Sequence, residues 1–175
     1  MSPIIRAVQA RRRLLAVSLA VGAPTVALWL PGCIPDESCE EDPRAQVLDA
    51  RVMVTVAGAQ LEAELAATET ARARGWKYRR CDREALWLVP DEAPGPLSVW
   101  GCALDEAIDV AFVADGVVVG WSPELAPCGD REASGPIACV GCSLVASPGD
   151  VDGVLETPAG QLGLAVGDAV QIEQP

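Results

Sequence analysis

The chain has 175 residues, half of them apolar, with 13 basic and 25 acidic residues and no histidine. This composition is typical of a single globular domain with a real core. Its acidity disfavours contact with nucleic acid, so we expect no nucleic-acid partner. The missing histidine excludes Ser-His-Asp and Cys-His nucleophile systems as well as zinc sites with histidine ligands. We expect no metal and no cofactor.

Residues 1–32 have the composition of an export signal. A basic start with Arg6 and Arg11–Arg13 is followed by an apolar run, Leu14–Leu30. The next residues, Pro31-Gly32-Cys33, complete a sequence that resembles a bacterial lipobox, in which Cys33 would be lipidated. We therefore predict a chain outside the cytoplasm, tethered to the membrane on its periplasmic or extracellular face. Plain secretion and a retained N-terminal anchor are the alternatives.

Removal of this signal leaves 9 basic and 25 acidic residues, a net charge of 9 − 25 = −16. Residues 33–44 are acidic and read as a spacer, and residues 45–175 form the predicted domain. Six cysteines remain after Cys33, and an even number in an oxidising compartment predicts disulfides whose pairing the sequence leaves open. They are Cys39, Cys81, Cys102, Cys128, Cys139 and Cys142.

The Cys139-Val140-Gly141-Cys142 motif has three interpretations. Structural disulfides would clip the long loop from Cys128 to Cys142. The alternatives are a redox pair, or one half of a metal site that other cysteines complete. Redox pairs of this spacing usually open a helix that lowers the thiol pKa, and the loop composition argues against a helix here.

The alternation of apolar and polar residues predicts seven short strands. They lie at 47–56, 61–67, 85–89, 108–113, 117–121, 154–156 and 170–173. A short helix should begin after Thr68 and end at Gly75, and residues 158–167 should form one or two helical turns. Residues 123–148 are expected to form a long loop. The fold class is therefore mainly β, a single small barrel-like domain with one or two short helices.

Two groups of side chains are candidates for a ligand site. Trp76, Lys77 and Arg79 belong to a basic cluster that could receive an anion or instead form a solvated helix end. Asp109 could be a buried acid of raised pKa, paired with another carboxylate, or could bind backbone N–H groups at a strand start. The possible carboxylate partners are Asp105, Glu106 and Glu156.

Four tryptophans could form a surface for stacking sugars, or could fill a core that has one Phe and one Tyr. Trp87 and Trp100 lie in apolar runs, which favours burial. The sequence does not decide between the two roles for Trp76 and Trp121.

Several motifs occur in an order and spacing that resemble a known family. They are Ala73-Arg74-Gly75-Trp76-Lys77, Ala85–Val89, Ser98-Val99-Trp100 leading to Ala107–Val113, Val154–Gly160 and Gly167-Asp168. Together they resemble domain of unknown function family 192, whose members are often exported. The resemblance implies a fold and a location but no established reaction. The polar Lys-Asn-Thr of the family's central motif is replaced here by Cys102-Ala103-Leu104.

We therefore predict a cell-envelope lipoprotein or secreted accessory or binding module without a catalytic site. The alternative is an enzyme that uses Asp109 with Lys77 or Arg79, or a redox or metal role for Cys139 and Cys142. An enzyme requires convergent polar groups around one open cleft. We expect instead that Asp109 caps a strand, that Trp100 is buried and that the basic cluster lies at the surface.

Overall fold

The computed structural model describes residues 42–81, 84–130, 132 and 139–173, which belong to one compact unit, Pro35–Pro175. The predicted signal, Cys33 and Cys39 lie outside the described residues. In chain order the elements are β1 Arg51–Val56, β2 Ala59–Ala66, α1 Glu69–Arg74, β3 Ala85–Leu88, β4 Ser98–Trp100, β5 Ile108–Ala114, β6 Val117–Leu125, β7 Leu144–Ala146, β8 Gly153–Pro158 and β9 Val170–Glu173.

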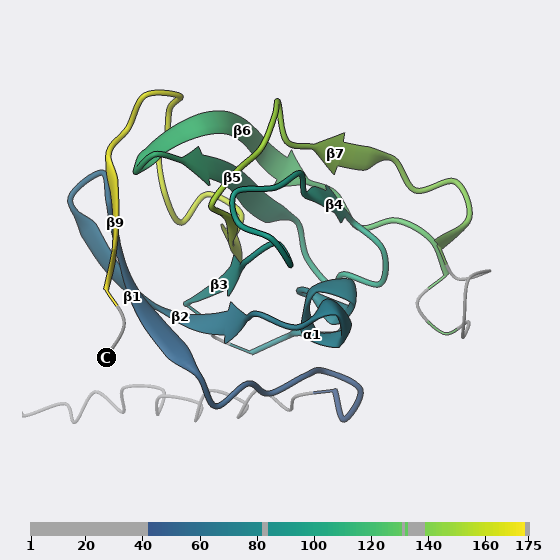
Figure 1. The fold of residues 1–175 in the computed structure, drawn as a ribbon. Helices are drawn as coiled ribbons and strands as arrows, with labels where there is room; N and C mark the ends of the chain where they lie inside the picture. The colour runs from purple at the N-terminus through teal and green to yellow at the C-terminus, as the bar shows by residue number, and fades with distance from the viewer. Residues whose placement is uncertain (1–41, 82–83, 131, 133–138, 174–175) are drawn as a thin grey trace, which may run out of the picture. The chain divides into compact units, whose positions relative to one another are not determined.

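Seven strands form one sheet in the order β6-β5-β8-β3-β2-β1-β9, and β4 pairs with β7 in a separate ribbon. Only the β2–β3 pair of the large sheet is parallel. The sheet curls so that its two end strands approach each other, as Figure 1 shows. Val117 at the start of β6 bridges Ala169, and the Val170 N–H donates to the Gly116 carbonyl oxygen. The predicted mainly β, barrel-like fold is confirmed.

The inner face of the curled sheet holds one hydrophobic cluster. Alternate residues of each strand supply it, because side chains point to opposite faces along a strand. Its members include Val52, Val54, Val56, Trp87 and Leu155, all buried. The predicted burial of Trp87 is thereby confirmed.

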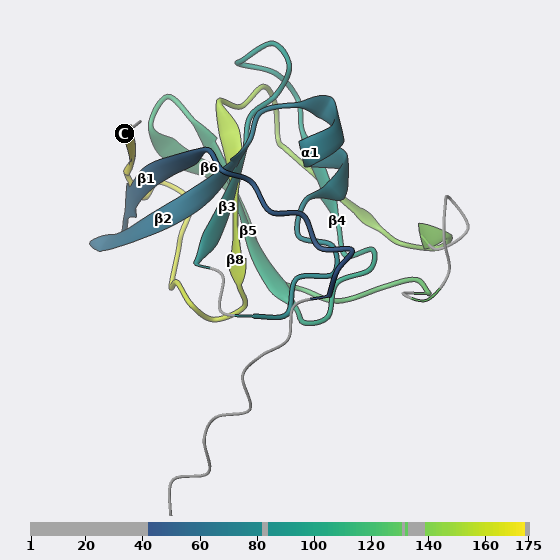
Figure 2. The ribbon, with the colours of Figure 1, turned by 90° about the horizontal axis from the view of Figure 1, so that it is seen from below.

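The outer face holds a second cluster, which includes Leu86, Val110 and Phe112 from the sheet. It is covered by Ala71 of α1, by Trp76 and by Val99 of β4. In Figure 2, α1 and β4 lie beside each other on one side of the sheet. The space between these two covering elements forms the site described below.

Local sequence signals explain where α1 and the central hairpin begin and end. The Thr68 side chain accepts from the Ala71 N–H at 3.2 Å, and the Gly75 N–H donates to the Ala71 carbonyl oxygen. Gly75 has φ +49°, which glycine adopts without the strain of a Cβ atom. Asp115 and Gly116 both have positive φ, the requirement of the tight hairpin turn between β5 and β6.

Two predicted segments differ from the structure. Pro158 ends β8, and residues 159–167 contain turns and no helix, because Gly160 has positive φ and interrupts a helical path. The segment 123–148 is not a plain loop, since β6 continues to Leu125 and residues 144–146 form β7. The pairing of β7 with β4 depends on residues distant in sequence, which a local pattern does not reveal.

Candidate ligand-binding cleft

An open cleft of about 470 Å³ lies between α1 with its C-terminal turn and the β4–β7 ribbon. This volume falls within the range of sites that bind small molecules. Its lining residues are Glu69, Arg72, Ala73, Arg74, Gly75, Trp76, Lys77, Leu88, Asp91, Leu97, Ser98, Val99, Trp100, Leu104, Leu144 and Glu156.

Glu156 of β8 lies at the buried base of the cleft. It is 2% exposed, and its Oε2 has no hydrogen-bond partner among the described residues. Desolvation by burial raises the pKa of Glu156 to about 7, although the positive charge of Arg79 opposes this effect. The carboxyl group is therefore able to donate or accept a proton near neutral pH, and its buried Oε2 keeps unused capacity for a hydrogen bond.

The register of the sheet explains why Glu156 is near a buried ion pair. Glu64 of β2 lies opposite Leu86 of β3, which lies opposite Glu156, so both carboxylates project from the outer face. Glu64 Oε2 accepts from Arg79 Nη2 at 2.8 Å and from the Leu48 N–H at 3.0 Å. Arg79 thus binds Glu64 and also influences Glu156 through its charge.

Trp76, Lys77 and Trp100 line the cleft, and Arg79 contacts Trp76 without lining it. The Arg79 guanidinium lies 5.3 Å from the centre of the Trp76 ring, and Trp76 is 7% exposed. Lys77 Nζ lies 4.8 Å from the centre of the Trp100 ring and donates to the Ala73 carbonyl oxygen at 3.0 Å. Desolvation lowers the pKa of Lys77. Lys77 therefore links the end of α1 to β4 across the cleft.

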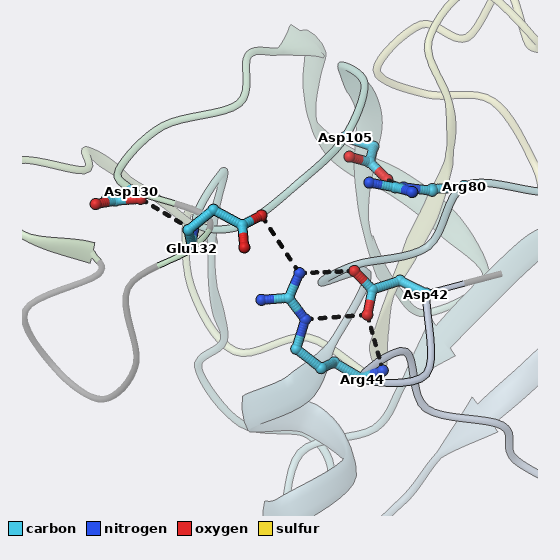
Figure 3. Close-up of polar contacts among 6 residues, drawn as sticks. All are labelled: Asp42, Arg44, Arg80, Asp105, Asp130 and Glu132. Carbon is cyan, nitrogen blue, oxygen red and sulfur yellow. Dashed lines mark hydrogen bonds and ion pairs between the residues drawn. The ribbon is translucent and has the colours of Figure 1, made fainter.

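The first described residues pack against the same end of α1. Figure 3 shows the Arg44 guanidinium between the carboxylates of Asp42 and Glu132. Arg44 Nη2 lies 2.7 Å from Asp42 Oδ2 and 3.6 Å from Glu132 Oε1. The same guanidinium lies 4.2 Å from the centre of the Tyr78 ring. Gln46 is buried and donates its side-chain amide to the carbonyl oxygens of residues 71 and 75, both at 2.9 Å. Gln46 therefore fixes the first described segment beside the C-terminal end of α1.

The structure brings together only part of the predicted site. Trp76 and Lys77 line the cleft, whereas Arg79 is 2% exposed and lies beneath it. The expected surface position of the basic cluster is thus wrong for Arg79, which the buried Glu64 carboxylate draws inward. Arg80 follows the expectation, since its side chain is 46% exposed and pairs with Asp105.

Asp109 does not line the cleft. Its two carboxylate oxygens accept from the N–H groups of Glu124 and Gly160, at 2.9 and 2.8 Å. The expectation that it serves backbone N–H groups is confirmed. The cleft that Lys77 lines does not include Asp109. The expected burial of Trp100 is also wrong: the residue is 37% exposed, because the ribbon that carries it leaves one face uncovered.

Glu156 was identified from the sequence only as a partner for Asp109. A glutamate at the end of the apolar run Gly153-Val154-Leu155 is a signal of a buried acid. The cleft residues Glu69, Arg72, Arg74 and Asp91 carried no such signal, because their convergence depends on the contact of α1 with the ribbon.

Two disulfides fix the segment that follows β4. Cys102 pairs with Cys139, and Cys128 pairs with Cys142. The structural interpretation is confirmed, and a redox pair between Cys139 and Cys142 is contradicted because each is bonded elsewhere. Cys81 is disulfide-bonded as well. Such bonds are typical of an oxidising, non-cytoplasmic compartment.

The described part of the chain contains neither a cluster of metal ligands nor a helix that could span a membrane. No group of three or more cysteine, aspartate or glutamate side chains there is arranged to hold a metal ion. None of the helical segments that the structure describes has the length and apolar composition to cross a bilayer.

Comparison with known proteins gives a family and a fold. No curated protein matches the chain. A protein described as a candidate transcription regulator from Sinorhizobium meliloti 1021 superposes with a TM-score of 0.56 and 24% identity, over 70% of this chain and 92% of that one. A protein of unknown function from Novosphingobium aromaticivorans gives a TM-score of 0.55 and 23% identity, over 75% and 91%. Residues 52–172 match the model of DUF192, described as Uncharacterized ACR, and the chain therefore belongs to this family.

Proposed function

We propose that this chain is an exported, envelope-anchored binding module that holds a small molecule in the cleft between α1 and β4. The observation that carries this proposal is Glu156, a buried carboxyl group with an unpartnered oxygen at the base of an open cleft. Leaving a buried polar group without a partner costs about 1–3 kcal/mol, a cost that a bound ligand would remove. Convergent polar groups in an apolar pocket are typical of a binding site.

The proposed location rests on the two described disulfides and on residues 1–32, in which a basic start is followed by an apolar run. Lipidation at Cys33 would tether the chain to the membrane. Membrane fractionation of Cys33→Ser tests this part. We expect the variant to leave the membrane fraction, and an unprocessed variant that stays in that fraction would favour a retained anchor.

A thermal-shift screen tests the cleft itself. Sugars, peptides, carboxylates and metal salts would be compared on the wild type, on Trp100→Ala and on Trp121→Ala. Trp100 lines the cleft and Trp121 does not, so the second variant is the matched control. A ligand at 100 times its dissociation constant should stabilise by about 2.7 kcal/mol. A shift lost in both variants, or kept in both, would argue against binding in the cleft.

One observation favours a second candidate, an enzyme with Glu156 as general acid–base. Its pKa of about 7 is the value at which a carboxyl group transfers protons most effectively at neutral pH. This candidate predicts turnover of any molecule found in the screen, with loss of turnover but retention of binding in Glu156→Gln. A ligand recovered chemically unchanged after prolonged incubation would exclude turnover of that ligand.

A further inference from the structure

The charged side chains in the cleft balance one another. Three acids and three bases line it: Glu69, Asp91, Glu156, Arg72, Arg74 and Lys77. This balance contrasts with the net charge of −12 of the whole chain. A local excess of one sign would attract a ligand of the opposite sign, and the cleft has no such excess.

Two of the cationic groups are already engaged within the protein. Arg72 pairs with Asp91 and donates to the carbonyl oxygens of Ala67 and Val89. Lys77 donates to the Ala73 carbonyl oxygen and lies over the Trp100 ring. An anionic ligand would have to compete with these contacts and would meet three carboxyl groups in the same walls. An anion is therefore disfavoured.

A cationic ligand is disfavoured for the corresponding reason. Arg74 and Lys77 line the same cleft as Glu156, and the buried Arg79 guanidinium already places a positive charge near this carboxyl group. Repulsion from Arg79 is only weakly screened, because Arg79 and Glu156 are both buried. The group that fits Glu156 Oε2 is consequently an uncharged donor.

Gly75 lies directly beside the buried carboxyl group of Glu156. A Cβ atom at this position would lie 3.7 Å from Oε2 and 3.8 Å from Oε1, in direct contact with both. Glycine leaves that space open. The remaining walls are largely apolar and include Trp76 and Trp100, so a ligand needs an apolar face as well as a donor.

We propose that the cleft binds a neutral saccharide, with a ring face against the tryptophan wall and a hydroxyl group donating to Glu156. This inference rests on the proposed binding function. A sugar ring joins C–H groups on its faces to O–H donors at its edge, which matches a half-apolar cleft with a single buried acceptor. Trp100 supplies the exposed aromatic surface, and Ser98 adds a hydroxyl group at the rim.

The test follows the indole N–H signals of the full-length chain, purified in a detergent without a sugar headgroup and labelled with ¹⁵N-tryptophan. Cellobiose and maltose are the neutral probes. Glucose, glucosamine and glucuronate form a matched set that differs in charge. We expect neutral sugars to shift the signals of Trp76 and Trp100 in a saturable manner and to leave those of Trp87 and Trp121 unchanged, because only the first two line the cleft.

Substitution of Glu156 tests the polar contact. Glu156→Leu should weaken binding about tenfold, as expected for the loss of one hydrogen bond to a buried acceptor. Asp109→Asn is the control, since Asp109 is a buried carboxylate on the neighbouring strand with both oxygens bonded to backbone N–H groups. If Glu156→Leu fails to fold, Trp100→Ala at the exposed ribbon should abolish binding instead.

The outcomes separate the two proposals. Shifts of Trp76 and Trp100 caused only by glucosamine or only by glucuronate would overturn the assignment of a neutral saccharide and leave the binding cleft intact. No shift with any sugar, or a shift confined to Trp121, would also overturn the saccharide assignment. In that case the broader thermal-shift screen decides whether the cleft binds another class of molecule.

Discussion

Arg79 and Glu64 form a buried ion pair in which Nη2 lies 2.8 Å from Oε2. Glu64 belongs to β2, and Arg79 lies beyond the C-terminal end of α1. The pair therefore connects the segment after the helix to the outer face of the sheet, directly beneath the cleft. Burial of both charges is tolerated because the attraction between them offsets the cost of desolvation. The Leu48 N–H also donates a hydrogen bond to the Glu64 carboxylate.

Removal of Arg79 should destabilise the fold strongly. Arg79→Met leaves Glu64 buried without its closest cation, and we expect the free energy of unfolding to fall by about 3–5 kcal/mol. Arg80→Met is the matched control: Arg80 is partly exposed and its ion pair with Asp105 should contribute about 0–1 kcal/mol. Urea denaturation measures both. Similar losses in the two variants would contradict the structural importance assigned to the buried pair.

Glu156 should make the stability depend on pH. Its pKa is raised from 4.5 to about 7 in the folded state, so the folded chain holds this proton more tightly than the unfolded chain. Its contribution to stability is therefore full below about pH 4.5 and is lost as the pH rises to about 7. The loss amounts to about 3 kcal/mol, from about 1.4 kcal/mol for each unit of pKa.

Glu156→Gln isolates this contribution because glutamine does not titrate. The variant should gain about 3 kcal/mol relative to the wild type between pH 4.5 and pH 7, as measured by urea denaturation at several pH values. Comparison of the two proteins cancels the titration of all other groups. A difference that stays constant over this range would show that the carboxyl group titrates as it does in the unfolded chain.

Local sequence signals predicted much of the fold. The cap at Thr68, the stop at Gly75 and the turn at Asp115-Gly116 act within a few residues, so their chemistry can be identified without knowledge of tertiary structure. The alternation in β1 and β2 follows from burial of one face of the sheet. These features hold because they depend on residues adjacent in the chain.

The cleft depended on contacts that no local pattern encodes. Trp100 lies in an apolar run, yet it is partly exposed because β4 pairs only with the short strand β7. Arg79 lies in a basic cluster, yet it is buried by a carboxylate 15 residues earlier in the chain. Both positions are set by packing between elements, which overrides the average preference of a residue type.

The two disulfides should hold the segment after β4 in place. The double substitution Cys128→Ser and Cys142→Ser removes a cross-link between residues 14 positions apart. The chain-entropy model predicts that the free energy of unfolding falls by about 3 kcal/mol. The double substitution Cys102→Ser and Cys139→Ser removes a cross-link between residues 37 positions apart and should lower the free energy of unfolding by about 4 kcal/mol. Thermal unfolding without reductant measures both. Detection of reactive thiols from these four residues in the denatured, unreduced wild type would contradict the pairing.

Gly75 should be required for the end of α1 and for the space beside the Glu156 carboxyl group. Its φ of +49° is strained for any residue with a Cβ atom, and that atom would lie 3.4 Å from the Arg72 carbonyl oxygen. Gly75→Ala should therefore lower the free energy of unfolding by about 1–3 kcal/mol. Gly163→Ala is the control, because a Cβ atom there meets nothing within 4 Å and the backbone lies outside the left-handed region.

The free energy of unfolding of Gly163→Ala should equal that of the wild type or exceed it by about 0.4–1 kcal/mol, because alanine reduces the conformational freedom of the unfolded chain. Urea denaturation separates the two variants, and equal stability would mean that the backbone at Gly75 relaxes without cost. Binding supplies an independent measurement at the same position. The added methyl group contacts both oxygens of Glu156, so a ligand that bonds this carboxyl group should bind Gly75→Ala more weakly than Gly163→Ala. Unchanged affinity in Gly75→Ala would place the ligand away from Glu156.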